Sequence, residues 1–347
     1  MVTDGIDALL LSVGADLPYL TGYRAMPLER LTMAVVTDAR AVLIVPALEA
    51  PRVTDGGSPF EVVPWDEGGD PVSLVSRLVP DEASIAIGAQ TWARFVLELQ
   101  EALPGSTWRD ATGVTSALRV RKDDGELARL RAVGAAADSV MTSLSDTGFA
   151  GRTERQLAAE IDRRLRQAGH ETVEFVIVAS GPNGASPHHE PGDRVMKSGD
   201  LVVCDFGGSM GGYQSDTTRT FSVGEPEDDR VSAYAALQSA QQVAFEAVAV
   251  GVTCESIDAA ARAHLEAEGW GEFFIHRVGH GIGLDVHEEP YLVKGNDSEL
   301  EPGMAFSIEP GIYIPGRFGM RLEDIVAVTS DGVERLNNSP RELVVVG

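Results

Sequence analysis

The chain has 347 residues, of which 28 are basic and 53 acidic, giving a formal net charge of −25 at pH 7. A chain this acidic repels phosphates, which disfavours nucleic acids and anionic membranes as partners, although the charge also fits a plain solvated acidic surface. The first twenty residues contain no lysine or arginine, and no run approaches 18 apolar residues. We therefore expect no signal peptide and no membrane span, and the two cysteines suit a reducing cytoplasm.

The first 120 residues alternate short apolar runs with amphipathic stretches, which predicts an α/β domain. The runs expected to form buried strands are 8–11, 33–36, 41–45 and 84–87. Helices are expected near residues 71–79 and 91–102. No group of residues here has the spacing of metal ligands or of a nucleophile and its base, so we interpret this part as a scaffold or specificity domain.

A polar stretch from Arg119 to Glu126 interrupts this pattern with charges of both signs and candidate helix N-caps. It is the expected domain boundary, and we divide the chain into residues 1–121 and 122–347.

The second part combines helical periodicity with strand-like segments, which predicts an α+β catalytic domain. One helix is expected to start at Thr153, which has the capping-box spacing with Gln156, and to stop at Gly169. The other expected helices are 126–144, 230–250 and 255–268. The expected strands are 173–179, 201–206, 213–223, 304–314 and 320–329.

Four carboxylates in this second part lie where they would repel one another. Asp205 and Asp216 flank a glycine-rich centre, and Glu309 and Glu323 lie symmetrically about Gly316. If each segment folds as a hairpin, the acids of each pair lie roughly opposite each other, which is destabilising unless they are neutralised. The sequence therefore predicts bound divalent metal, with salt-bridged hairpins as the alternative.

Five of the seven histidines fall in two short stretches, which contain His188 and His189, and His276, His280 and His287. The glycines around His280 disfavour a regular helix and let the backbone bring an imidazole close to an ion. Four carboxylates match the charge of two divalent cations, and His280 would complete the ligands of one. This donor set suits Mn²⁺, Co²⁺, Zn²⁺ or Fe²⁺. On an extended chain His189 points away from His188, so we do not expect it among the ligands.

These motifs, in this order, resemble those of the pita-bread metallopeptidases, which include prolidases, aminopeptidase P and methionine aminopeptidases. The resemblance covers about residues 123–347, and the first 120 residues resemble the creatinase-type N-terminal domain. It implies an α+β pita-bread catalytic domain preceded by a smaller creatinase-like α/β domain. The segments that carry it are 204–207, 215–220, 278–283, 308–311 and 321–324.

The resemblance implies a role for each candidate metal ligand. Asp205 would bind one metal ion and His280 the other, while Asp216 and Glu323 would bridge them. Glu309 would bind metal and also accept a proton from the attacking water.

The resemblance also implies residues that handle the substrate. His287 would hydrogen-bond the scissile carbonyl or the developing oxyanion, His188 would contact the carboxylate or carbonyl of the proline, and His276 would wall the proline pocket. Arg321 is two residues from Glu323, so on a strand both point to one face. There it could orient carboxylates, bind the substrate carboxylate or form a structural ion pair.

The implied function is a dimetal peptidase that cleaves the bond preceding proline, first of all in Xaa-Pro dipeptides. The short N-terminal domain favours the compact prolidases. The alternatives are an aminopeptidase P acting on longer Xaa-Pro peptides, and a metal-free creatinase-like hydrolase or non-catalytic binding protein. The resemblance also implies two divalent ions, with Mn²⁺ preferred to Co²⁺ or Zn²⁺, and a homodimer.

Overall fold

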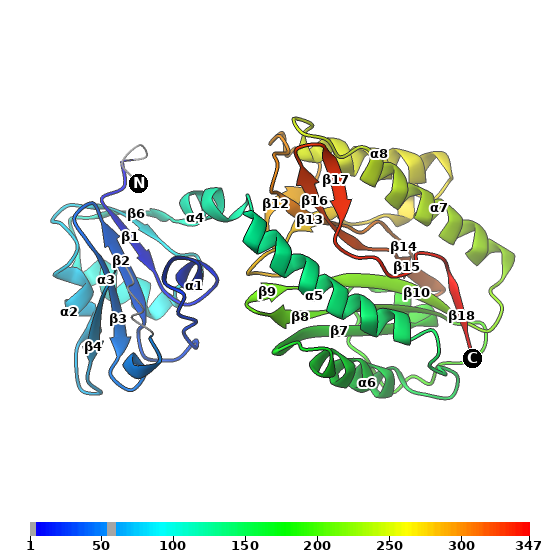
Figure 1. Cartoon of the computed structure of the whole chain (residues 1–347), viewed down its shortest axis with the longest axis horizontal. Helices are drawn as coiled ribbons and strands as arrows, with labels where there is room; N and C mark the ends of the chain where they lie inside the picture. Colours follow the sequence, from blue (N-terminus) through cyan, green and yellow to red (C-terminus); the bar gives the residue numbers. More distant parts are fainter. Residues whose placement is uncertain (1–4, 54–59) are drawn as a thin grey trace. The chain divides into compact units, whose positions relative to one another are not determined.

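The computed structural model describes residues 5–53 and 60–347 (Figure 1). The chain divides into two compact units, 1–119 and 120–347, a division two residues before the boundary expected from the sequence. Within the described ranges, no helix combines the length and the apolar character needed to cross a membrane.

The first unit is a six-stranded mixed sheet with helices packed on it, in the strand order β4-β3-β2-β1-β5-β6. Its central strands supply alternate side chains to two apolar clusters, one on each face of the sheet. The strands are β1 Ala8–Leu11, β2 Met33–Thr37, β3 Ala41–Pro46, β4 Glu61–Trp65, β5 Ser84–Ile87 and β6 Thr107–Asp110. The helices are α1 Asp16–Thr21, η2 Ala50–Arg52, α2 Pro71–Ser76, α3 Ala93–Ala102 and α4 Thr112–Arg119.

The four strands and two helices expected in this unit are confirmed. The sequence missed β4 and β6, which are the edge strands of the sheet. Both are largely polar or half-exposed, and β4 contains Pro64, so neither has the buried apolar run that marks the central strands.

The second unit contains a sheet of order β18-β10-β8-β7 with β9 paired to β8, a sheet of order β12-β11-β13-β16-β17, and the hairpin β14-β15. Its first strands are β7 Thr172–Ser180, β8 Leu201–Met210, β9 Tyr213–Gln214 and β10 Thr217–Val223. The others are β11 Gly279–Gly281, β12 Glu288–Leu292, β13 Ala305–Ile308, β14 Gly311–Ile314, β15 Phe318–Arg321, β16 Asp324–Thr329, β17 Gly332–Arg335 and β18 Val344–Val346.

Two pairs of helices cover these sheets (Figure 1). Helices α5 and α6 share an apolar cluster with β7, β8 and β10, whereas α7 and α8 pack on β13 to β16. The capping box of α6 is present as predicted: the side chain of Thr153 accepts from Gln156, whose side chain accepts from the Thr153 N–H. The helices are α5 Asp124–Ser143, α6 Glu154–Gln167, α7 Asp228–Glu246 and α8 Cys254–Ala267, with the short η3 Gly181–Ala185 and η4 Gly271–Phe273.

Three segments expected to be single strands are each divided in two, and every division falls at an acidic residue of the predicted metal site. Asp216 lies between β9 and β10, Glu309 between β13 and β14, and Glu323 between β15 and β16. At Glu309 the chain passes from the sheet that contains β13 and β16 to the β14-β15 hairpin, and at Glu323 it returns to that sheet. The sequence pattern missed these divisions because a change of sheet does not interrupt the apolar character of the strand.

The register of the strands refines the prediction of opposed acids. Glu309 and Glu323 fall opposite each other, because the pairings on both sides of them keep one register. Asp205 is instead paired with Thr218, and Asp216 lies two positions before Thr218 in the sequence. A shift of two positions keeps both aspartates on the same face of the sheet.

Candidate metal centre

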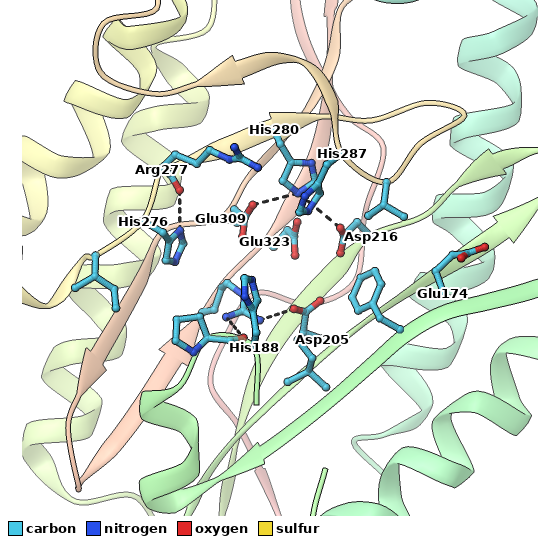
Figure 2. A pocket seen from close by; sticks show the side chains of 16 residues that line it. Glu174, His188, Asp205, Asp216, His276, Arg277, His280, His287, Glu309 and Glu323 are labelled. Carbon is cyan, nitrogen blue, oxygen red and sulfur yellow. Dashed lines mark hydrogen bonds and ion pairs between the residues drawn. The ribbon is translucent and has the colours of Figure 1, made fainter. Parts of the chain in front are cut away.

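A cavity of about 870 Å³ lies in the second unit, and all nine predicted site residues line it (Figure 2). Strands β8 and β11 contribute Asp205 and His280, and the strand divisions contribute the three other predicted metal ligands. The nine are Asp205, Asp216, His280, Glu309 and Glu323, and His188, His276, His287 and Arg321.

The candidate ligands form overlapping groups, each of three ligand atoms within 4.8 Å of one another. One group contains Asp205, Asp216 and Glu323, and a second contains His280, Glu309 and Glu323. A third joins Asp216 and His280 to His287. Asp216, Glu323 and His280 each belong to two groups. Of these three, the two carboxylates have a second oxygen atom and can therefore be shared between two ions.

The electrostatics of this cluster fit a divalent cation. Burial, followed by the charges of neighbouring carboxylates, raises the pKa of Asp216 and of Glu323 well above their ordinary values, and burial also raises the pKa of Asp205. Within the described residues, Asp205 Oδ1 and Glu323 Oε1 are buried without a hydrogen-bond partner. Buried carboxylate oxygens without a donor are rare in proteins, and a cation would satisfy both.

Glu309 differs from the other three acids. Burial on its own would raise its pKa, but His280, whose Nε2 lies 3.3 Å from Glu309 Oε1, outweighs this effect and brings the pKa to about 2. Glu309 is therefore ionised at neutral pH.

Hydroxyl groups hold two of the carboxylates in place. Thr218 Oγ1 donates to Glu323 Oε2 at 2.7 Å, and Ser307 Oγ donates to Glu309 Oε1 at 3.1 Å. Ser307 Oγ also accepts from the backbone N–H of His280 at 3.0 Å. Sequence reasoning did not find Thr218 or Ser307, because an isolated hydroxyl residue in a strand carries no signal of its distant partner.

Arg321 is buried beneath the cluster, and protein groups occupy its donors. Its guanidinium donates to Asp205 Oδ2, to the hydroxyl of Tyr313 at 2.8 Å and to Thr218 Oγ1 at 3.2 Å. The Tyr313 hydroxyl in turn lies 2.9 Å from His276 Nε2. These contacts favour the orienting role predicted for Arg321 over direct binding of a substrate carboxylate.

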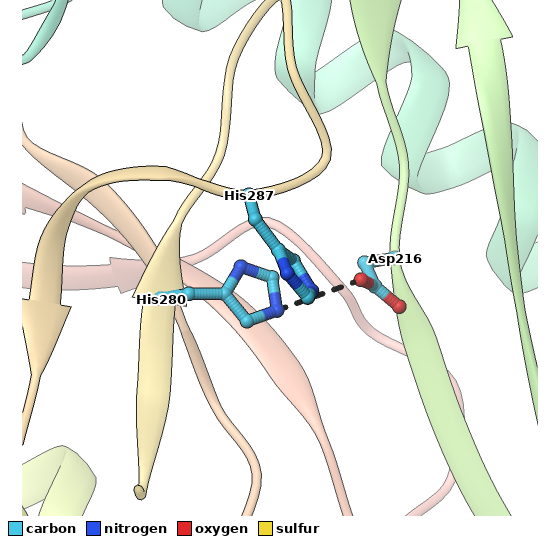
Figure 3. Close-up of side chains that lie close together, drawn as sticks. All are labelled: Asp216, His280 and His287. Atoms are coloured by element: carbon cyan, nitrogen blue, oxygen red, sulfur yellow. Dashed lines mark ion pairs between the residues drawn. The ribbon is translucent and has the colours of Figure 1, made fainter. Parts of the chain in front are cut away.

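His280 and His287 lie together at one wall of the cavity, facing Asp216 (Figure 3). Their ring centroids are 3.9 Å apart, and His280 Nε2 is 3.8 Å from Asp216 Oδ2. The glycines beside His280 allow β11 to approach β13 closely, since a Cβ atom at Gly279 would lie 1.9 Å from the backbone oxygen of Ser307. Although His287 is exposed, desolvation and the neighbouring His280 lower the pKa of His287 to about 4, so its ring is neutral at pH 7.

The loop that carries His188 is fastened by a buried carboxylate that the sequence analysis missed. Glu154, at the start of α6, is fully buried and accepts hydrogen bonds from Ser180, Asn183 and Gly192. Its Oε2 also lies 2.9 Å from Nε2 of His189. Burial would raise the pKa of Glu154, but the hydrogen bonds, led by those from Ser180, lower it below its ordinary value. The expectation that His189 lies outside the ligand set agrees with this contact.

Replacing Glu154 by alanine should destabilise the protein by roughly 3–5 kcal/mol, because several buried donors would lose their common acceptor. Its kcat/KM should fall more than the folded fraction does, because the loop would no longer hold His188 in place. Thermal unfolding and steady-state kinetics measure both effects. Asp193→Ala is the matched control, since Asp193 lies on the same loop in an exposed ion pair with Arg155 and should change little. Equal effects of the two variants would contradict the anchoring role.

Fold and site together define a protein with a candidate divalent-metal centre formed by carboxylates and imidazole between two sheets. Residues 128–330 match the model of metallopeptidase family M24, and residues 1–121 match the creatinase/prolidase N-terminal domain. The chain therefore belongs to metallopeptidase family M24. The expected pita-bread catalytic domain and creatinase-like N-terminal domain are confirmed.

Similar proteins extend over nearly the whole chain. The probable dipeptidase PepE of Mycobacterium tuberculosis is 48% identical over 348 residues, which cover 99% of this chain and 92% of the relative. The Xaa-Pro dipeptidase of Lactobacillus helveticus is 36% identical, covering 98% and 95%. The crystal structure of the prolidase from Thermococcus sibiricus superposes with a TM-score of 0.95 at 35% identity, covering 99% of this chain and 96% of that one.

Proposed function

We propose that this chain is a metal-dependent dipeptidase that hydrolyses the bond between a first residue and a C-terminal proline. The observation that carries the proposal is the cavity in which the predicted metal ligands meet His188, His276 and His287. Similarity to prolidases and Xaa-Pro dipeptidases over nearly the full length supports the choice of substrate.

We further propose that Asp205, Asp216, His280, Glu309 and Glu323 hold two divalent ions. Mn²⁺ is our first choice and Co²⁺ or Zn²⁺ the alternatives, since all three accept this donor set; metal analysis of protein purified without chelator tests the choice. When bound, the ions would polarise the scissile carbonyl and make the attacking water more acidic.

The remaining catalytic and binding roles belong to side chains of the protein. The ionised carboxylate of Glu309 accepts the proton of the attacking water. The neutral ring of His287 donates a hydrogen bond to the carbonyl oxygen as negative charge develops on it. His188 and His276 enclose the proline on the side of the cavity that they line. Arg321 and Tyr313 hold Asp205 and His276 in position.

Peptide length distinguishes this proposal from an aminopeptidase P activity. The metal-loaded protein should show a kcat/KM for leucyl-proline roughly 10-fold or more above that for leucyl-prolyl-glycine, because the longer peptide lacks the carboxylate at proline. Steady-state rates with both peptides test this. Faster cleavage of the tripeptide would favour aminopeptidase P, and full activity after metal removal would favour a metal-free hydrolase.

The family resemblance also leads us to propose a homodimer, which analytical ultracentrifugation tests. For location we propose the cytoplasm. Cys204 and Cys254 are both buried and unpaired, as suits a reducing compartment, and cell fractionation tests this.

A further inference from the structure

The charges around the cavity differ between its two sides. Apart from the metal ligands and the buried Arg321, two lining residues carry a formal charge, Glu174 and Arg277. Figure 2 shows Glu174, from β7, on one side of the carboxylate cluster and Arg277, next to His276, on the other. A dipeptide has its own positive and negative ends, so a cavity with this asymmetry distinguishes the two orientations of such a substrate.

Arg277 is held in place by an aromatic ring, while its donors stay available. Its guanidinium carbon lies 4.3 Å from the ring centroid of Tyr291, and the residue is half-buried. In residues 5–53 and 60–347, no carboxylate forms an ion pair with this guanidinium. Arg321, the other arginine of the cavity, is instead committed to Asp205 and Tyr313. Stacking on a ring restricts a guanidinium to a plane and leaves its donor edge able to bind an oxyanion in a bidentate manner.

The position of Arg277 matches the end of the substrate that carries a carboxylate. It immediately follows His276, and its backbone oxygen lies 2.7 Å from Nδ1 of that ring. The cavity is also lined by His188 and Pro187, and by Phe175 and Ile177 of β7, the strand that carries Glu174. In Figure 2 the side chain of Arg277 extends toward His280 and His287.

We propose that Arg277 determines the specificity for dipeptides by binding the free carboxylate of the substrate's C-terminal proline. This inference rests on the proposed dipeptidase function. A carboxylate that enters the cavity loses part of its hydration and needs a charged partner, and arginine provides two parallel donors to it. A longer peptide has a neutral peptide bond at that position and gains much less from the guanidinium.

The test compares leucyl-proline with leucyl-proline amide, which differ only in the charge at the proline end. Arg277→Ala should raise the KM for leucyl-proline roughly 10- to 100-fold, with a much smaller change in kcat. The kcat/KM for leucyl-proline amide should fall far less. The ratio of the kcat/KM for leucyl-proline to that for the amide should therefore decrease sharply. Arg277→Lys should restore part of the ratio, since it keeps the charge without the planar fork.

Variants of the stacking partner and of a distant arginine complete the experiment. Tyr291→Phe keeps the ring and should resemble the wild type, while Tyr291→Ala should shift the ratio in the direction of Arg277→Ala. Arg317→Ala is the matched control, because Arg317 also stacks on a ring, that of Phe318, but lies outside the cavity. Thermal unfolding and metal content verify that each variant is folded and loaded.

The outcomes separate the two proposals. If the wild type does not cleave leucyl-proline, the proposed function is wrong and the role of Arg277 falls with it. If the wild type cleaves leucyl-proline but Arg277→Ala affects both substrates by the same factor, or neither, only the role of Arg277 is overturned. A selective loss on leucyl-proline supports both.

Discussion

Replacing Glu323 by glutamine should affect the metal-free and the metal-loaded protein in opposite directions. The carboxylate of Glu323 is buried beside Asp205 and Asp216, and neighbouring acids raise its pKa well above the ordinary value. Without metal, Glu323 must at pH 8 either stay ionised among like charges or take up a proton when the chain folds, and the neutral amide removes both costs. The midpoint of thermal unfolding at pH 8 should therefore rise by a few degrees, where 1 kcal/mol corresponds to about 2–4 °C.

With metal, the same variant should lose both binding and catalysis. Glu323 belongs to two of the ligand groups, so its loss weakens the site for both ions. We expect less metal per chain, a smaller stabilisation by added Mn²⁺, and a fall in kcat/KM of about 10³-fold or more.

Unfolding curves with and without chelator, metal analysis and peptide hydrolysis measure these effects. Glu301→Gln is the matched control, since Glu301 forms an exposed ion pair with Arg121 and should change none of them. A metal-free Glu323→Gln protein that is less stable than the wild type would contradict the repulsion argument.

Glu309→Gln should lower kcat by roughly 10²- to 10⁴-fold, because the amide cannot accept a proton from water. The KM should change much less, since neither His188 nor His276 is altered. Stopped assays with leucyl-proline give both constants, and metal analysis shows whether the site is still loaded.

Ser307→Ala is the control for orientation. It removes the hydroxyl that donates to Glu309 Oε1 but leaves the carboxylate in place, so we expect a loss of about tenfold or less. A Glu309→Gln protein with a kcat within tenfold of the wild type would contradict the assignment of Glu309 as base. Such a result would favour a metal-free mechanism, or a role for Glu309 outside proton transfer.

The parts of the fold that follow from local pattern were predictable. Central strands such as 41–45 are continuous apolar runs, and the capping box at Thr153 is contained within four residues. The candidate metal centre could also be predicted from the sequence, because four acids and a histidine among glycines are costly unless a cation joins them. The points at which the chain changes sheet were not, because they depend on pairing with strands that are distant in the sequence.

The missing site residues share the same physical cause. Glu154 meets its partners 26 to 38 positions further along the chain, and Thr218 meets Glu323 across 105 positions. Arg277 looks like any surface arginine in the sequence, and only the fold brings it onto Tyr291 and into the cavity. In each case the function depends on a tertiary neighbour that no local spacing indicates.

The division of the proposed metal ligands between two sheets has a consequence for how long the protein persists in the cell. Asp205 and Asp216 come from the layer that α5 and α6 cover, whereas His280 comes from the layer that α7 and α8 cover. Neither layer alone has the complete set of proposed donors, so ion binding would fasten the two halves of the catalytic unit to each other. Starvation for metal would therefore shorten the lifetime of the protein as well as silence it, and the supply of the ion would control the amount of enzyme that a cell retains.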